Sequence, residues 1–311
     1  MIFCYQRLTR GLGDAIMLRP AIIGSMVKHP EARHVLHCLK NTSPIFRDIV
    51  GLEIVEFPDG KLAKGFDNDA YCKLVLESRK LISRLDGEMT IFQLSKSESE
   101  YEYENAPSQI VNGKYVPTGK KIELSRQDIW CNIVDVPFSI DNYNIKFFDA
   151  EYEYADKFLA DKSNPLVIHL KSVDKARSYK YPDTFIDYFA KKWDGYIIVL
   201  DGEYRGLAKN VLTLKADIRQ VWCVISKCSA LIGIDSFGIH ASGSTGVKTY
   251  GMFGPTDPRC RLLYHRAISS DSYEKCSVQP CWYKNCQYVP CLNARKPSWY
   301  WEDFRLKMGR F

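Results

Sequence analysis

A carboxylate, a hydroxyl and an imidazole follow a strongly apolar run in the second half of the chain. Residues 231–234 read Leu-Ile-Gly-Ile, and residues 235–240 continue Asp-Ser-Phe-Gly-Ile-His. A buried strand that leads into a turn and a helix places such side chains where open α/β sheets bind ligands, and a helix start favours negative charge. We therefore expect a diphosphate site at Asp235, Ser236, Phe237, Gly238 and His240. A purely structural role is the alternative for His240.

The first apolar run of the chain also ends in residues suited to chemistry. Gly11, Leu12, Gly13 and Asp14 follow it, and the two glycines allow a tight turn whose backbone N–H groups face outward at a helix start. This turn predicts a corner that binds an acceptor. Asp14 has two interpretations, because it either caps the helix or takes a proton from an acceptor hydroxyl as a general base.

A third segment, residues 252–258, reads Met-Phe-Gly-Pro-Thr-Asp-Pro. This composition is typical of a plain turn. Because neighbouring strand ends converge on one crevice, the segment also predicts a wall beside Asp235 that contains Thr256 and Asp257.

Four cysteines, Cys276, Cys281, Cys286 and Cys291, recur at every fifth residue. Four thiolates bind zinc tetrahedrally, but the C-x2-C spacing of common zinc sites is absent. The sequence leaves a structural zinc ion and packed free thiols both open. The remaining cysteines are scattered singly, which is typical of reduced thiols that pack as small apolar groups.

The elements that must position these residues alternate between short apolar runs and longer helical segments. This pattern predicts an α/β protein with parallel sheets, and 311 residues exceed what one core usually organises. We expect two Rossmann-like domains, residues 1–155 and 156–311, the second with a cysteine-rich segment at 276–291. Strands are expected at 2–6, 34–39, 53–57, 89–93, 166–170, 196–200, 211–214, 231–235 and 249–253, and helices at 14–28, 69–85, 151–162 and after Pro182.

Two segments break this rhythm. Residues 95–121 are polar, contain the turn-prone pair Asn112-Gly113 and show no apolar period, which predicts a long excursion or lid. The tail from Pro297 to Phe311 carries several aromatic residues, and we expect it to pack back on the N-terminal domain.

Composition limits the class of protein further. The net charge of +6 suits anionic ligands, but it is too diffuse to identify nucleic acid as a partner. The first residues lack the pattern of a secretory signal, and no apolar run approaches transmembrane length. We expect a cytoplasmic protein, with peripheral membrane contact and the oligomeric state left open.

Taken together, Gly-Leu-Gly-Asp after the first strand, the Asp-Ser run that leads to His240, and the Phe-Gly-Pro-Thr-Asp-Pro loop resemble glycosyltransferase family nine, the heptosyltransferase family. The resemblance covers most of the chain. It implies a GT-B fold, in which an N-terminal acceptor domain and a C-terminal nucleotide-sugar domain face each other across a cleft. It also implies inverting transfer without a required cofactor. Asp14 would be the general base, and Ser236, Gly238 and His240 would hold the diphosphate of the donor.

Two positions depart from the family pattern. Phe237 stands where the family usually has glycine, and Tyr179 stands where it usually has a cation. We expect Arg177 or Lys180 to stabilise the leaving phosphate instead, unless both are solvated surface cations. Glu203 is expected either to meet the sugar or nucleoside of the donor or to belong to a plain turn.

The identity of the transferred sugar, whether hexosyl, heptosyl or pentosyl, is not fixed by the sequence, and neither is the acceptor. A glycolipid or a saccharide is what the resemblance implies. A non-catalytic nucleotide-binding module is one alternative, although the joint presence of Asp14 and His240 argues against it.

A modified base in DNA or another nucleic acid is a second alternative for the acceptor. In that case cations near the middle of the chain would follow the phosphates and an aromatic ring would stack on a base, whereas scattered cations usually only solvate a surface. The residues concerned are Lys114, Lys120, Lys121, Arg126 and Tyr115.

Overall fold

The computed structural model describes residues 1–60, 67–106, 108–112, 114–143, 145–200, 202–262, 267–269, 292 and 295–309. The chain divides into two compact units, one formed by Met1–Asn105 with Glu123–Lys146 and the other by Ala106–Ile122 with Phe147–Phe311. The division along the chain therefore falls after Lys146, whereas the sequence analysis expected it after residue 155. Helix α5 (Asp149–Leu159) belongs to the second unit because buried Glu151 pairs there with Arg219.

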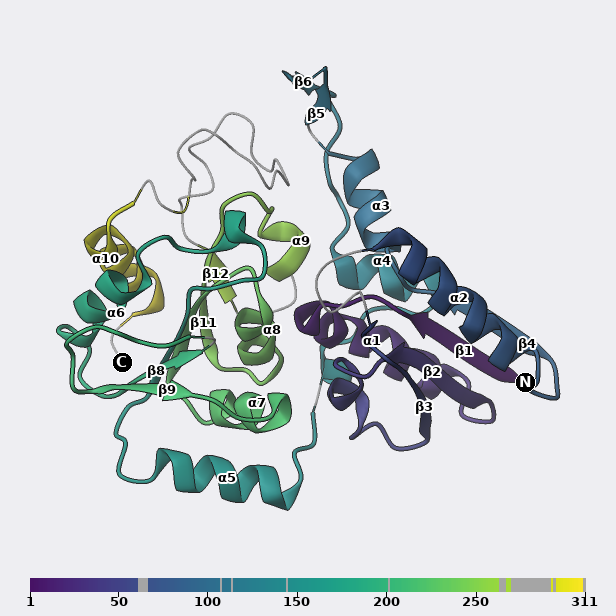
Figure 1. The fold of residues 1–311 in the computed structure, drawn as a ribbon, viewed down its shortest axis with the longest axis horizontal. Coiled ribbons are helices and arrows are strands. Elements are labelled where there is room, and N and C mark those ends of the chain that lie inside the picture. Colours follow the sequence, from purple (N-terminus) through teal and green to yellow (C-terminus); the bar gives the residue numbers. More distant parts are fainter. Residues whose placement is uncertain are drawn as a thin grey trace. The chain divides into compact units, whose positions relative to one another are not determined.

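The first unit is built on a parallel sheet with strand order β3-β2-β1-β4 (Figure 1). All residues of β1 are buried, because helices and loops cover both faces of this central strand. The four expected strands are confirmed with small changes at their ends. The elements are β1 (Ile2–Arg7), α1 (Leu12–Lys28), β2 (Arg33–Leu39), β3 (Leu52–Phe57), α2 (Asn68–Ile82), β4 (Met89–Gln93), α3 (Ser97–Glu104) and α4 (Arg126–Ile133).

The second unit repeats the architecture with a parallel sheet of order β12-β11-β10-β7-β8-β9. Strands β7 and β10 are buried along their whole length, and they lie next to each other at the centre. The α/β class is thus confirmed in both units. The elements are β7 (Leu166–His169), α6 (Pro182–Ala190), β8 (Ile197–Leu200), β9 (Val211–Leu214), α7 (Ile218–Ser226), β10 (Ala230–Ile234), α8 (Phe237–Ser244), β11 (Lys248–Met252), α9 (Arg259–Leu262), β12 (Ala267–Ser269) and α10 (Pro297–Met308).

The polar excursion contains regular elements that the sequence analysis did not identify. It contains α3 and an antiparallel hairpin of β5 (Ser108–Val111) and β6 (Lys114–Pro117). The hairpin turns at Asn112, whose φ of 50° suits the Asn-Gly turn signal. Helix α3 escaped prediction because the residues that it buries are charged: Glu98 and Glu102 lie four positions apart on one face.

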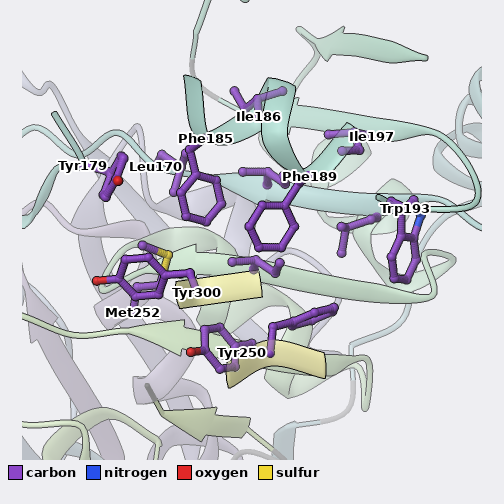
Figure 2. Packing of buried hydrophobic residues seen from close by; sticks show 14 of the residues in the cluster. Leu170, Tyr179, Phe185, Ile186, Phe189, Trp193, Ile197, Tyr250, Met252 and Tyr300 are labelled. Atoms are coloured by element: carbon purple, nitrogen blue, oxygen red, sulfur yellow. The ribbon is translucent and has the colours of Figure 1, made fainter. Parts of the chain in front are cut away.

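The aromatic tail forms α10 and packs in the core of the second unit, which corrects the expectation that it packs on the N-terminal domain. Helix α10 lies beside α6 (Figure 1). Tyr300 and Phe304 are buried against Phe185, Phe189 and Tyr250, and Figure 2 shows part of this cluster. The aromatic side chains of the tail therefore complete the hydrophobic core beneath the C-terminal sheet.

Removal of the Phe304 ring tests this role of the tail. Phe304 is 1% exposed, so we expect Phe304→Ala to lower the free energy of unfolding by about 3–5 kcal/mol through lost burial and a cavity. Leu306 lies on the same helix but is 75% exposed, and Leu306→Ala should change stability by less than about 0.5 kcal/mol. Chemical denaturation measures both, and equal effects of the two substitutions would contradict the assignment.

Candidate functional site

Three neighbouring strand ends of the second unit bring charged side chains together. Strand β10 lies between β7 and β11, and all three run in the same direction. The loop after β7 supplies Arg177, the end of β10 supplies Asp235, and the segment after β11 supplies Arg261. The topology thus gathers residues that are up to 84 positions apart (177 to 261) at one edge of the sheet.

Asp235 is the centre of this group. Its side chain is 4% exposed, and its Oδ2 lies 3.5 Å from Arg177 Nη1 and 3.5 Å from Arg261 Nε. His240 Nε2 lies 3.7 Å from Oδ1. Burial alone would raise the pKa of Asp235, but Arg261, His240 and Arg177 outweigh it and hold the pKa well below its usual value. Asp235 is therefore an ionised carboxylate with two guanidinium neighbours.

The first turn of α8 holds the predicted diphosphate residues. Ser236 is the N-cap residue in an extended conformation, and His240 is buried one turn further on. The Gly238 N–H donates to His169 Nδ1 at 3.2 Å. The ring of Phe237 packs edge-on against Trp222 of α7, with 6.5 Å between the ring centroids. The aromatic residue at the family's glycine position is thus accommodated by the core.

Arg177 and Lys180 occupy different environments. Arg177 Nη1 donates to the Asp235 carbonyl oxygen at 2.9 Å, and its side chain keeps 29% exposure. Lys180 is exposed and lies over the Tyr181 ring at 5.2 Å. Tyr179, at the position where the family usually has a cation, is a buried core residue whose hydroxyl donates to the Arg295 carbonyl oxygen. Of the two candidate cations, only Arg177 lies at the strand ends of the group.

The segment after β11 reaches Asp235 through a residue that the sequence analysis did not select. Thr256 and Asp257 are buried. The Arg259 backbone N–H donates to the Asp257 carboxylate at 2.8 Å, and the Arg259 guanidinium donates to the same carboxylate. Arg261 is 3% exposed and approaches Asp235. A buried arginine has no sequence signature of its own, because burial depends on the neighbours that neutralise it.

A small hollow lies at the ends of β7 and β8. Apolar side chains of Ile168, Leu170, Ile186 and Val199 line it, and Lys171, Asp183 and Glu203 are at its polar part. Glu203 is exposed and pairs with Arg205 at 3.0 Å.

In the first unit, Asp14 lies in the first turn of α1 at the end of β1. The N-cap residue is Gly11, which has no side chain to cap the helix, and Asp14 is the third residue of the helix. Asp14 accepts a hydrogen bond from Arg126 Nη1 at 2.5 Å and lies 3.5 Å from Arg7 Nη2. Gly11 has a φ of 125°, and a Cβ there would stand 2.5 Å from Asp14 Oδ2. Glycine at this position therefore provides both the backbone conformation and the space for the carboxylate. Gly13 is the second residue of the helix.

Arg126 connects Asp14 to the acidic face of α3. Its guanidinium binds Glu102 through two hydrogen bonds of 2.9 Å, and Arg7 Nη1 binds Glu98 at 3.0 Å. Burial would lower the pKa of Arg126, but Asp14, Glu102 and Glu98 outweigh it and raise the pKa well above its usual value. Asp14 keeps 23% side-chain exposure, whereas Glu98 and Glu102 keep 4% each.

This pairing corrects one element of the nucleic-acid alternative. Arg126 is buried in an ion pair, so it is not a surface cation that follows phosphates. Lys120 and Lys121 are exposed, and the side chains of Lys114 and Tyr115 lie outside the described residues.

The expected zinc or thiol cluster at Cys276, Cys281, Cys286 and Cys291 also lies outside the described residues. Within the described part of the chain, no group of three or more histidine, cysteine or acidic side chains is arranged to hold a metal ion. No helix among the described residues has the length and apolar character needed to cross a membrane.

Comparison with known proteins finds similar proteins by structure but not by sequence. No family model matches the chain, and no curated protein matches it. A glycosyltransferase of family 9 from Veillonella parvula aligns with 98% of this chain and 96% of its own at 15% identity, with a TM-score of 0.67. E. coli ADP-heptose lps heptosyltransferase II aligns with 87% and 90% at 12% identity (TM-score 0.59), and E. coli heptosyltransferase WaaC with ADP aligns with 86% and 92% at 12% identity (TM-score 0.55). The chain therefore has the GT-B fold that its motifs predicted.

The buried ion pairs of Arg126 give a stability prediction. Arg126→Gln leaves Glu102 and Asp14 without their main counterion, so we expect the free energy of unfolding to fall by about 3–5 kcal/mol. Arg33 binds Glu53 with the same two-bond geometry, but on the surface, and Arg33→Gln should change stability little. Denaturation at neutral pH compares the two variants. A small loss for Arg126→Gln would show that the network contributes little.

Proposed function

We propose that this chain is an inverting glycosyltransferase that moves a sugar from a nucleotide-diphosphate donor to a hydroxyl acceptor, similar to the heptosyltransferases. Asp14 acts as the general base, and the ends of β7, β10 and β11 bind the donor. The main support is the exposure of Asp14: among the three carboxylates of its ion-pair cluster, it alone keeps substantial access to solvent. The GT-B fold, which the family 9 glycosyltransferase and heptosyltransferase II share, also supports the proposal.

On the donor side, the α8 turn and Glu203 provide polar groups for a nucleotide. The Ser236 hydroxyl and the N–H groups at the start of α8 other than that of Gly238 suit phosphate oxygens, because a hydroxyl and helix N–H groups donate to anions. The Glu203 carboxylate is exposed after the end of β8 and suits ribose hydroxyls. ADP occupies one structure of E. coli WaaC, which has the same fold. The base of the donor for this chain is left to experiment.

Departure of the nucleotide leaves a diphosphate with increasing negative charge. Arg177 and Arg261 both approach Asp235, and Arg177 Nε also lies 3.7 Å from Asp174 Oδ2. Arg177 is partly exposed, so its guanidinium is able to turn from Asp235 toward a phosphate without unfolding the strand end. We assign Arg177 as the cation that stabilises the leaving group.

On the acceptor side, the contacts with Arg126 and Arg7 fix the direction of the Asp14 side chain. An acceptor hydroxyl that binds its exposed side donates a hydrogen bond to it and loses the proton as the bond to the sugar forms. Inversion follows from this single displacement, in which the nucleophile attacks the face opposite the leaving diphosphate. The acceptor is a hydroxyl of a saccharide or a glycolipid.

Asp14→Asn tests the base. The donor is first identified as the nucleotide sugar that raises the melting temperature of the wild-type protein. With that donor and a panel of saccharide acceptors, Asp14→Asn should lower kcat by about 10²- to 10⁴-fold and leave the donor Kd unchanged. Asp69 is an exposed acid in the first turn of α2, and Asp69→Asn should leave kcat unchanged. Full transfer activity in Asp14→Asn would refute the assignment.

Arg177→Gln and Lys180→Gln separate the two candidate cations. We expect Arg177→Gln to lower kcat by about 10²- to 10³-fold, because it removes charge stabilisation of the leaving diphosphate. Lys180→Gln should resemble the wild type because Lys180 is exposed and lies over Tyr181. Initial rates at saturating donor measure both, and the reverse order of effects would transfer the role to Lys180.

A further inference from the structure

His169 is a buried residue that makes direct contact with the first turn of α8. It is the last residue of β7, it is 0% exposed, and it pairs in register with Gly233 of β10. Its Nδ1 accepts the Gly238 N–H at 3.2 Å. His169 of β7 thus binds the Gly238 N–H. At other helix starts such an N–H group is available to bind an anion.

The contact is tightly fitted. A Cβ on Gly238 would stand 2.7 Å from His169 Nδ1 and 3.3 Å from its Cβ and Cγ. Atoms do not pack at such a distance, so the imidazole occupies the space that a side chain at position 238 would take. The position of the His169 ring therefore requires glycine at position 238.

The direction of the hydrogen bond fixes the state of the ring. A backbone N–H only donates, so Nδ1 is unprotonated and accepts. An imidazolium has donors on both nitrogens, so a ring that accepts at Nδ1 is neutral. The proton of the neutral ring then lies on Nε2. His169 acts here as a neutral acceptor.

The turn that His169 holds leads directly from Asp235 to His240. Gly238 lies two residues after Ser236 and two before His240. The hydrogen bond ties this turn to β7, the strand whose following loop carries Arg177. A shift of the turn would displace the Ser236 hydroxyl and the His240 ring relative to Arg177.

We propose that His169 is a positioning residue of the donor site: as a neutral acceptor for the Gly238 N–H, it holds the first turn of α8 in the conformation that binds a nucleoside diphosphate. This inference rests on the proposed function, since it assumes that the turn binds a diphosphate. His169 itself need not touch the donor.

Two substitutions of His169 test the role. ADP, GDP and UDP are first screened with the wild-type protein, and the one that binds is titrated into the variants. His169→Leu removes the acceptor, and we expect it to raise the Kd by about tenfold or more. His169→Asn keeps an acceptor oxygen close to the position of Nδ1, so its Kd should stay within about threefold of the wild type.

The outcomes separate the inference from the function on which it rests. If His169→Leu is less stable than the wild type but binds the diphosphate with unchanged Kd, the residue is only structural and the inference fails. If the wild-type protein binds none of the three diphosphates or their sugars, the proposed function fails, and the inference fails with it. Rescue of binding by His169→Asn but not by His169→Leu supports the inference.

A double-mutant cycle tests the fitted contact from the other side. Alanine is a better helix former than glycine, so a loss in Gly238→Ala would come from the clash with the imidazole. We expect Gly238→Ala to raise the Kd by about tenfold in the wild-type background and by less than about threefold in a His169→Ala background. Equal effects in both backgrounds would overturn the proposed coupling.

Discussion

Buried charged side chains must pair with side chains of opposite charge, and this constraint determines the arrangement of the candidate sites in both units of the protein. Asp235 is nearly inaccessible and remains ionised because Arg177 and Arg261 approach the same oxygen. In the first unit, Arg126 compensates Asp14 and Glu102 in the same way. Each ion-pair group forms at the carboxyl end of a central parallel strand, where the topology brings loops from several strands together. The side chains proposed for chemistry are the members of these groups that keep some exposure.

Two glycines provide the space that these groups need. A Cβ on Gly11 would stand 2.5 Å from Asp14 Oδ2, and one on Gly238 would stand 2.7 Å from His169 Nδ1. Asp14 Oδ2 thus occupies the space that a side chain at position 11 would need, and His169 Nδ1 occupies the space that one at position 238 would need. Only Gly11 also has a positive φ, so the requirement for glycine at position 238 comes from packing rather than from backbone conformation.

The departures from the family pattern are accommodated by aromatic packing. Phe237 turns toward Trp222, and Tyr179 joins the cluster that Phe185 and Tyr300 form beneath the C-terminal sheet. Helix α10 supplies part of that cluster, which explains why a tail rich in aromatic residues belongs to the second unit (Figure 2). Arg177, two positions before Tyr179, donates to the Asp235 carbonyl oxygen at the strand ends, and it is the cation that we propose for this role.

The sequence by itself determined the fold class, most of the strands and the turns that carry Asp14 and Asp235, because apolar period and glycine-rich turns are local signals. It did not reveal α3, whose buried face is acidic, and it did not reveal the roles of Arg261, Arg126 and His169. From their neighbours in sequence alone, Arg261 resembles a surface-loop residue, Arg126 an ordinary residue at a helix start, and His169 an ordinary strand residue. The tertiary structure decided their roles, because ion pairing and the fit to Gly238 join residues that lie far apart along the chain.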